Sequence, residues 1–216
     1  MDGMNKIVRQ ANAVKCETVI KNLRKRQIDG YYCETVREAN EKLLSFIHDG
    51  ETVSWGGSVT LDEIDVKEKI SMLGAKVIDV WAYEKPEESM EAKRKALSSD
   101  VFITSTNAVT IDGQLVNIDG TGNRVAAMAF GPEKVIIVAG VNKIASNVGD
   151  ALERIKSKAC TANAIRLGKQ TPCAKTGECA NCLIPGETLC CSTVITRFSN
   201  RKGRMHVILV NEELGY

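Results

Sequence analysis

Residues 117–131 combine glycines with polar side chains in a pattern typical of an anion-binding corner. An extended run at residues 114–118 leads into a tight turn, and a short apolar helix is expected at residues 125–130. Glycines let the backbone approach a ligand closely, and a helix start offers unpaired N–H groups at the positive end of its dipole. The candidate binding residues of this corner are Gly120, Thr121, Gly122, Asn123 and Arg124. Asp119 is the candidate general base or orienting carboxylate, and a plain strand-to-helix connection is the alternative interpretation.

Three more polar turns follow predicted strands. Gly56, Gly57 and Ser58 follow the strand expected at residues 52–55, Asn107 follows residues 101–104, and Lys143 follows residues 135–138. Ligands of open α/β sheets bind beyond the carboxyl ends of the strands, so we expect these turns to gather there. With Arg124 they would suit a phosphate, a carboxylate or a nucleotide-like cofactor. The plainer interpretations are a solvated lysine and an asparagine that caps its own turn.

Residues 171–191 hold five of the eight cysteines, in the spacing C-x5-C-x2-C-x7-C-C. The candidate metal ligands are Cys173, Cys179, Cys182 and Cys190. Because this segment lacks a hydrophobic pattern, it would gain much from a metal; structural zinc contributes roughly 10–16 kcal/mol in isolated fingers. Zinc and an iron–sulfur cluster both stay open, and free or redox-active thiols are the third interpretation. The scattered cysteines are expected to be packed thiols, namely Cys16, Cys33 and Cys160.

Length and composition narrow the class of protein. The 216 residues are expected to form a single domain, 44% of them are hydrophobic, and 26% are charged. A net charge of +2 with 5% aromatic residues does not indicate nucleic-acid binding. No apolar run is long enough to span a bilayer and no signal-peptide pattern is present, so we expect a cytoplasmic protein without membrane insertion. Neither a Walker A loop nor a G-x-G-x-x-G motif supports an NTPase or an NAD enzyme.

Helical and apolar extended segments alternate along the chain, which predicts an α/β fold with a mixed, largely parallel sheet. Helices are expected at residues 5–26, after Thr35, after Pro86 and at residues 147–158. Asp112 and Gly113 predict a hairpin within residues 108–118. Residues 193–198 and 205–210 are expected to close the chain as a second hairpin.

A set of segments keeps a characteristic order and spacing along the chain, namely Ser105-Thr106-Asn107-Ala108-Val109-Thr110, Gly113, Leu115-Val116-Asn117-Ile118-Asp119-Gly120-Thr121-Gly122-Asn123-Arg124-Val125-Ala126, Gly131-Pro132, Gly140-Val141-Asn142-Lys143-Ile144 and Glu213-Leu214-Gly215-Tyr216. These segments resemble the LUD domain family of the LutC and YkgG type, which is named for lactate utilisation. Thr171-Pro172-Cys173 and the pair Cys179 and Cys182 also match one branch of the family.

The resemblance implies a three-layer α/β/α domain similar to the NagB/RpiA/CoA-transferase superfamily, whose members bind phosphosugars, CoA esters or folates at glycine-rich strand ends. It also implies a subunit that acts beside iron–sulfur partner subunits in oxidising L-lactate to pyruvate. The resemblance supplies no catalytic residue set, and this chain lacks the full ferredoxin-type cysteine motifs of those partners.

Three functional hypotheses follow. The first is a subunit or accessory factor in organic-acid oxidation that binds an anionic small molecule between residues 56–58 and 119–124. In it, Arg124 pairs with the anion and Asp119 orients a hydroxyl or accepts a proton. The second is an isomerase or an acyl or CoA transferase with Asp119 as base. The third is a metal-stabilised scaffold whose cysteine segment docks a redox partner.

Overall fold

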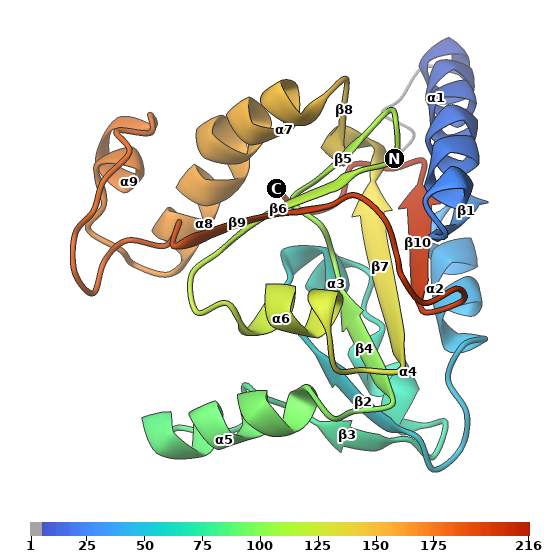
Figure 1. Cartoon of the computed structure of the whole chain (residues 1–216), viewed down its shortest axis with the longest axis horizontal. Helices are drawn as coiled ribbons and strands as arrows, with labels where there is room; N and C mark the ends of the chain where they lie inside the picture. Colours follow the sequence, from blue (N-terminus) through green and yellow to red (C-terminus); the bar gives the residue numbers. More distant parts are fainter. Residues whose placement is uncertain (1–5) are drawn as a thin grey trace.

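The computed structural model describes residues 6–216, and their strands form two sheets (Figure 1). The larger sheet has six strands in the order β1-β10-β7-β4-β2-β3, and every pairing in it is parallel. These strands are β1 (Asp29–Cys33), β2 (Thr52–Trp55), β3 (Lys76–Ile78), β4 (Val101–Thr104), β7 (Lys134–Gly140) and β10 (Met205–Val210). The smaller sheet has the order β8-β5-β6-β9 and consists of β5 (Ala108–Thr110), β6 (Leu115–Asp119), β8 (Ile144–Ala145) and β9 (Ser192–Thr196).

Helices cover both faces of the six-stranded sheet. The first four are α1 (Lys6–Lys25), α2 (Val36–Leu44), α3 (Val59–Glu63) and α4 (Lys67–Ser71). They are followed by α5 (Pro86–Ala96), α6 (Asn123–Ala129), the 3-10 turn η1 (Val141–Lys143) and α7 (Val148–Arg154). The π-helical turn η2 (Ile155–Ala159), α8 (Cys160–Arg166) and α9 (Pro172–Thr176) complete the set. Helices α7 to α9 lie beside the smaller sheet (Figure 1).

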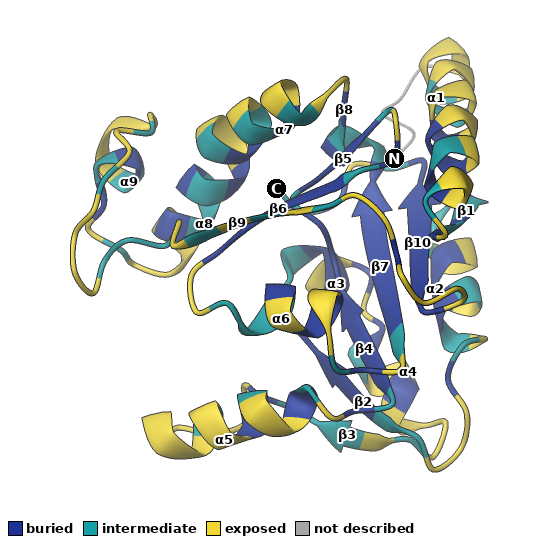
Figure 2. Cartoon of the chain, in the orientation of Figure 1, coloured by how far each residue is buried: buried dark blue, intermediate teal, exposed yellow. Residues whose placement is uncertain are grey.

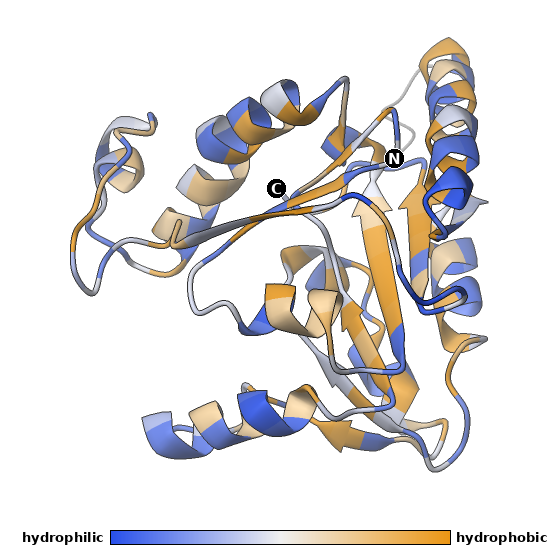
Figure 3. Ribbon diagram, in the orientation of Figure 1, coloured by the Kyte–Doolittle hydropathy of each residue, from blue (hydrophilic) through white to orange (hydrophobic). Residues whose placement is uncertain are grey.

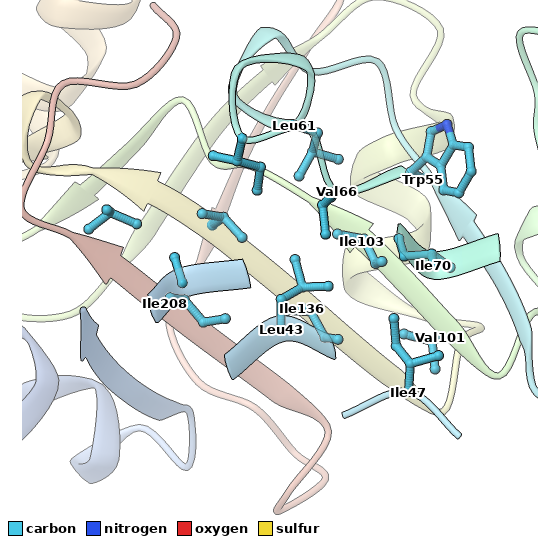
Figure 4. Packing of buried hydrophobic residues seen from close by; sticks show 14 of the residues in the cluster. Leu43, Ile47, Trp55, Leu61, Val66, Ile70, Val101, Ile103, Ile136 and Ile208 are labelled. Atoms are coloured by element: carbon cyan, nitrogen blue, oxygen red, sulfur yellow. The ribbon is translucent and has the colours of Figure 1, made fainter. Parts of the chain in front are cut away.

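The core is built from apolar strands whose successive side chains point to opposite faces. In β7, Ile136 and Val138 pack with α2, α3 and α4, while Val135 and Ile137 pack with α1 and with β5 and β6. Figure 4 shows the first of these clusters, and Figure 3 shows the apolar character of β4, β7 and β10. A fully buried aliphatic side chain contributes about 1.5–3 kcal/mol, so these continuous apolar strands favour the centre of a parallel sheet.

The predicted α/β class is confirmed, and the antiparallel pairs are segregated in the smaller sheet. The hairpin within residues 108–118 is present, since β5 pairs with β6 antiparallel and Gly113 takes a positive φ of 86° at its turn. The predicted closing hairpin is wrong. β10 lies between β1 and β7 in the large sheet, whereas β9 pairs with β6 in the small one.

The physical reason lies in the two strands themselves. All six residues of β10 are buried, as in a central parallel strand, while the residues of β9 alternate between half-buried and exposed, as at a sheet edge. A second difference concerns the helix predicted at residues 147–158, which continues through η2 and α8 to Arg166. No helix among residues 6–216 has the length and apolar character needed to cross a bilayer.

Candidate functional site

The carboxyl ends of β2, β4, β6 and β7 surround one cavity of about 220 Å³. Most of the residues predicted for the site line it, namely Gly57, Ser58, Asn107, Asp119, Gly120, Thr121, Asn123, Arg124 and Lys143. Gly56 and Gly122 are not part of its lining. The cavity is smaller than the roughly 300–1,000 Å³ sites that hold drug-sized ligands, so it suits a small molecule.

Arg124, at the start of α6, is the centre of the polar network beside this cavity. Its Nε donates to Asp119 Oδ2 at 3.1 Å in a salt bridge whose side chains are 13% and 9% exposed. The other donors go to two amide oxygens and two main-chain oxygens, which are Asn117 Oδ1, Asn107 Oδ1, Ser105 O and Ile118 O. A guanidinium has five N–H groups, so each of them is engaged within the protein.

Asp119 and Asn107 complete the network. Asp119 Oδ1 accepts from Gly122 N at 2.9 Å and its Oδ2 accepts from Arg124, so each carboxylate oxygen has a partner. Asn107 Oδ1 accepts from Ile118 N as well as from Arg124. These contacts tie the loop after β4 to the end of β6. Asp119, Asn107 and Arg124 therefore hold the strand-end turns in place.

Two glycines explain how the backbone fits around Arg124. Gly122 has a φ of 87° as the residue that precedes α6, a left-handed conformation that costs other residues energy. At Gly56 a Cβ atom would lie 3.1 Å from Arg124 Cδ, so only glycine allows this close packing without a shift. Both glycines act on the shape of the corner from outside the cavity.

Lys143 is buried, with 4% of its surface exposed, although it ends the short turn after β7. Its Nζ lies 2.7 Å from Thr60 Oγ1 and 2.9 Å from Ser105 Oγ. Burial, helped by the charges of Arg154 and Arg124, lowers the pKa of the Lys143 ammonium to about 7, and Glu63 opposes this shift. A large fraction of this amine is therefore uncharged near neutral pH.

The cysteine segment meets the corner through β9. The antiparallel pairing of β6 with β9 places Ser192 opposite Asp119, and Cys191 N donates to Asp119 O at 3.0 Å. Leu189 and Cys160 both line the cavity. Residues 171–191 and the strand-end turns are far apart in the sequence but lie in contact in the structure.

One pair of thiols in this region is close. Cys190 Sγ lies 3.3 Å from Cys160 Sγ, which was predicted to be a simple packed thiol. This shared hydrogen bond lowers the pKa of Cys190 to about 7 and raises the pKa of Cys160 above its ordinary range. The pair lies at the rim of the cavity because Cys160 belongs to its lining.

The other candidate ligands have local partners of their own, although Cys173 and Cys179 are near enough to help raise the pKa of Cys160. Cys173 Sγ contacts Thr171 Oγ1, Cys182 Sγ contacts Thr188 Oγ1, and Cys179 Sγ contacts Asn181. Within residues 6–216 no three His, Cys, Asp or Glu side chains are grouped as metal ligands. The donor atoms therefore do not fit a zinc or iron–sulfur site in the arrangement of this structure.

Besides Lys93 and Arg166 in the cavity lining, sequence reasoning missed four groups around Lys143 and the thiol pair. Thr60 and Ser105 contact Lys143, and Arg154 donates to the main-chain oxygens of Asn142, Asn107 and Tyr216. Cys160 is the fourth. Thr60 lies in α3 directly after the glycine turn, and Ser105 directly follows β4, so their closeness to the predicted turns could have found them. Arg154 and Cys160 lie on helices without a local signal.

Comparisons with known proteins agree with this fold. The LUD domain model matches residues 16–210. A DUF162 family protein from Deinococcus radiodurans is similar in structure, with a TM-score of 0.53 and 12% sequence identity over 94% of this chain and 98% of that chain. Among proteins with curated descriptions, no sequence matches this chain.

Two translation initiation factors are more distant. The eIF-2B protein of Pyrococcus horikoshii OT3 has a TM-score of 0.36 and 20% identity over 53% of this chain and 50% of that chain. The eIF2B beta of Chaetomium thermophilum has a TM-score of 0.38 and 17% identity over 53% and 44%. These partial likenesses carry no argument about function. The family model, by contrast, covers most of the sequence, and the chain belongs to the LUD domain family.

Proposed function

We propose that this LUD domain binds a small organic anion of the lactate type in its strand-end cavity, as a subunit or accessory factor of an organic-acid oxidation system. The observation that carries the proposal is the charge of the cavity lining. Lys93, Arg124 and Arg166 line it as cations, together with the partly protonated Lys143, whereas Asp119 is the single carboxylate among its described lining residues. Arg124 neutralises that carboxylate, so the remaining charge favours an anion. Family membership supports an association with lactate utilisation in general.

The binding roles are divided between two groups of residues. Arg124 has its donors engaged and its charge offset by Asp119, so we expect it to support the anion site by holding Asn107 and Asp119 in place. Direct contacts are expected from backbone N–H groups of the Gly120–Asn123 turn, from the hydroxyls of Ser58 and Thr121, and from Arg166. In this proposal Asp119 orients a hydroxyl.

The alternative of an isomerase or an acyl or CoA transferase requires Asp119 to act as a base. Both carboxylate oxygens of Asp119 already accept hydrogen bonds, which favours the orienting role. Turnover of sugar phosphates or CoA esters by the isolated chain would favour the enzyme. The scaffold alternative is weakened by the presence of a cavity at the strand ends.

The metal and the partners also stay proposals. A zinc ion or an iron–sulfur cluster at Cys173, Cys179, Cys182 and Cys190 requires the segment to rearrange from the arrangement described above. Metal analysis and the visible spectrum of protein purified without air test this directly. Iron with sulfide would favour an electron-transfer assembly with iron–sulfur partner subunits in the cytoplasm. Zinc would assign the cysteine segment a structural metal site. Absence of both metals would contradict metal coordination by these cysteines.

Isothermal titration calorimetry with L-lactate and with pyruvate tests the anion site. We expect Arg166→Gln to weaken binding about tenfold, because a hydrogen bond to a charged group contributes about 1.5–3 kcal/mol. Arg37→Gln is the matched control, since Arg37 is 84% exposed on α2 and does not line the cavity. The proposal fails if neither acid binds, or if both variants lose affinity equally.

A further inference from the structure

Lys143 has surroundings that a purely structural lysine rarely has. Buried lysines are usually paired with a carboxylate, because an isolated buried charge is costly. Here the Nζ contacts the hydroxyl oxygens of Thr60 and Ser105, and no carboxylate of residues 6–216 forms a salt bridge with it. Hydroxyl groups can donate to an amine as well as accept from an ammonium, so this environment accommodates the neutral form.

The neighbouring elements maintain that environment. Glu63, whose charge favours the protonated form of Lys143, accepts a hydrogen bond from Gly215 N at 2.6 Å. Gly215 itself packs against the amine, since a Cβ atom there would lie 3.2 Å from Lys143 Nζ and 2.5 Å from Thr60 Oγ1. The segment that ends in Tyr216 therefore packs against the lysine, and both Tyr216 and Lys143 line the cavity.

Two guanidinium groups face the same amine. Arg154 and Arg124 both disfavour its protonation, and Asp119 offsets part of the Arg124 charge. Desolvation beside another cation is the arrangement that activates a lysine as a nucleophile toward carbonyl compounds. The amine also lies in the lining of the cavity at these strand ends, where a small molecule can reach it.

We propose that Lys143 Nζ is a nucleophile that forms a Schiff base with the carbonyl carbon of a small 2-oxo acid bound in the cavity. The inference rests on the proposed anion site, which holds the carboxylate of the acid. The nitrogen lone pair forms the C–N bond while the carbonyl π electrons move to oxygen, and one proton passes from the nitrogen to that oxygen to give the carbinolamine. The nitrogen lone pair then forms the C=N bond as the oxygen leaves with a further proton as water, and loss of the second nitrogen proton balances this step and yields the imine. The hydroxyls of Thr60 and Ser105 contact the amine and can exchange protons with it.

The chemistry of the cavity selects this class of ligand. A neutral amine reacts with an electrophilic carbon, and the cation-rich lining attracts an anion. A 2-oxo acid carries both groups on adjacent carbons. At about 220 Å³ the cavity suits an acid of a few carbon atoms. A 2-hydroxy acid such as lactate has the carboxylate but no carbonyl, so it can bind without reacting.

Reductive trapping tests the proposal. The full chain is incubated with pyruvate and sodium cyanoborohydride, and its intact mass and tryptic peptides are measured. We expect one carboxyethyl group per chain, located on Lys143. Labelling should rise with pH through about 7 and then level off, because burial lowers the pKa of Lys143 to about 7. Surface lysines of ordinary pKa, about 10.4, should label much more slowly in this range.

Lys143→Met should lose this labelling, while Lys76→Met, an exposed position on the edge strand β3, should keep it. Peptide mapping of the labelled wild-type chain identifies the modified residue even where Lys143→Met fails to fold. Labelling spread over surface lysines, or labelling of another residue, would overturn the proposal. Pyruvate binding by calorimetry without trapping would overturn the Schiff base but leave the anion site standing. Absence of both binding and trapping would overturn both.

Discussion

The strand-end corner and the cysteine segment lie in contact but are held together in different ways. In the corner, Arg124, Asp119 and Asn107 satisfy one another across three chain segments. In the segment at residues 171–191, most contacts are local, such as those of Thr188 with Ile184 and with Cys182. Figure 2 shows the contrast, with β6 buried and the chain around α9 largely exposed or half-buried. Tertiary contacts thus order the first region, whereas the second relies on short-range turns.

The largest effect is expected where the corner loses its central cation. Arg124→Ala removes the guanidinium that neutralises the buried carboxylate of Asp119, and it takes one donor each from the amide oxygens of Asn107 and Asn117. Removing one partner of a buried ion pair costs about 3–5 kcal/mol. Urea denaturation measures this change in the free energy of unfolding. The exposed pair of Arg37 and Glu41 provides the control, since Arg37→Ala should cost about 0.5 kcal/mol or less.

A cost below about 1 kcal/mol for Arg124→Ala would mean that the corner does not depend on its ion pair. The contrast between the two regions would then be lost.

The next effect is a pH dependence that belongs to Lys143. Its pKa falls from 10.5 to about 7 on folding, so between these values the unfolded chain binds a proton that the folded chain does not. The free energy of unfolding therefore rises with pH across this window, by at most about 1.4 kcal/mol per pH unit. Below the window, the contribution of Lys143 does not change with pH. Denaturation curves of the wild type and of Lys143→Met should diverge in this direction. Parallel pH profiles would show that Lys143 is not desolvated.

A matched pair of glycines compares the two regions directly. Gly122 and Gly177 have φ values of 87° and 81°, and a Cβ atom would meet nothing within 4 Å at either. Alanine at each should therefore carry the same local strain, about 1–2 kcal/mol. We expect Gly122→Ala to lower the global free energy of unfolding by this amount. Gly177→Ala should mainly promote local opening of its segment, seen as faster hydrogen exchange, with a smaller global change.

The two variants therefore separate a tertiary from a local role. An equal global loss for both would show that residues 171–191 unfold together with the core, and the distinction drawn above would fail.

The smallest effect on stability is expected from the thiol pair. Cys160→Ser and Cys190→Ser should each change the free energy of unfolding by roughly 0.5 kcal/mol or less, since Cys190 is exposed. Diamide should nevertheless join the two sulfurs, which lie 3.3 Å apart, in a disulfide that mass spectrometry detects after alkylation. Either serine variant removes this product. Protection of Cys190 from the oxidant by added zinc would indicate that metal binding rearranges the segment.

Much of the fold was predictable because its signals are local. The apolar run that forms β7 and the Asp112-Gly113 turn of the hairpin were correctly read from their own residues. The turns after β2 and β4 lie at one edge because the carboxyl ends of neighbouring parallel strands end together, whereas the turn after β6 reaches the same cavity from the antiparallel pairs of the smaller sheet. The closing hairpin failed for the opposite reason. Two strands close in sequence were assumed to pair, although one had the burial of a central strand and the other that of an edge.

At the site, the sequence by itself determined which chemical groups were available and that they would follow strand ends. Tertiary structure alone decided their partners. Lys143 becomes a buried amine through Thr60, a residue 83 positions away, and Cys190 meets Cys160 across 30 positions. Backbone conformation and the period of the hydrophobic pattern depend on residues that are neighbours in the sequence, so both can be predicted from the sequence. Desolvation and charge depend on segments that meet only in the folded chain, and these properties separate a solvated lysine from a reactive one.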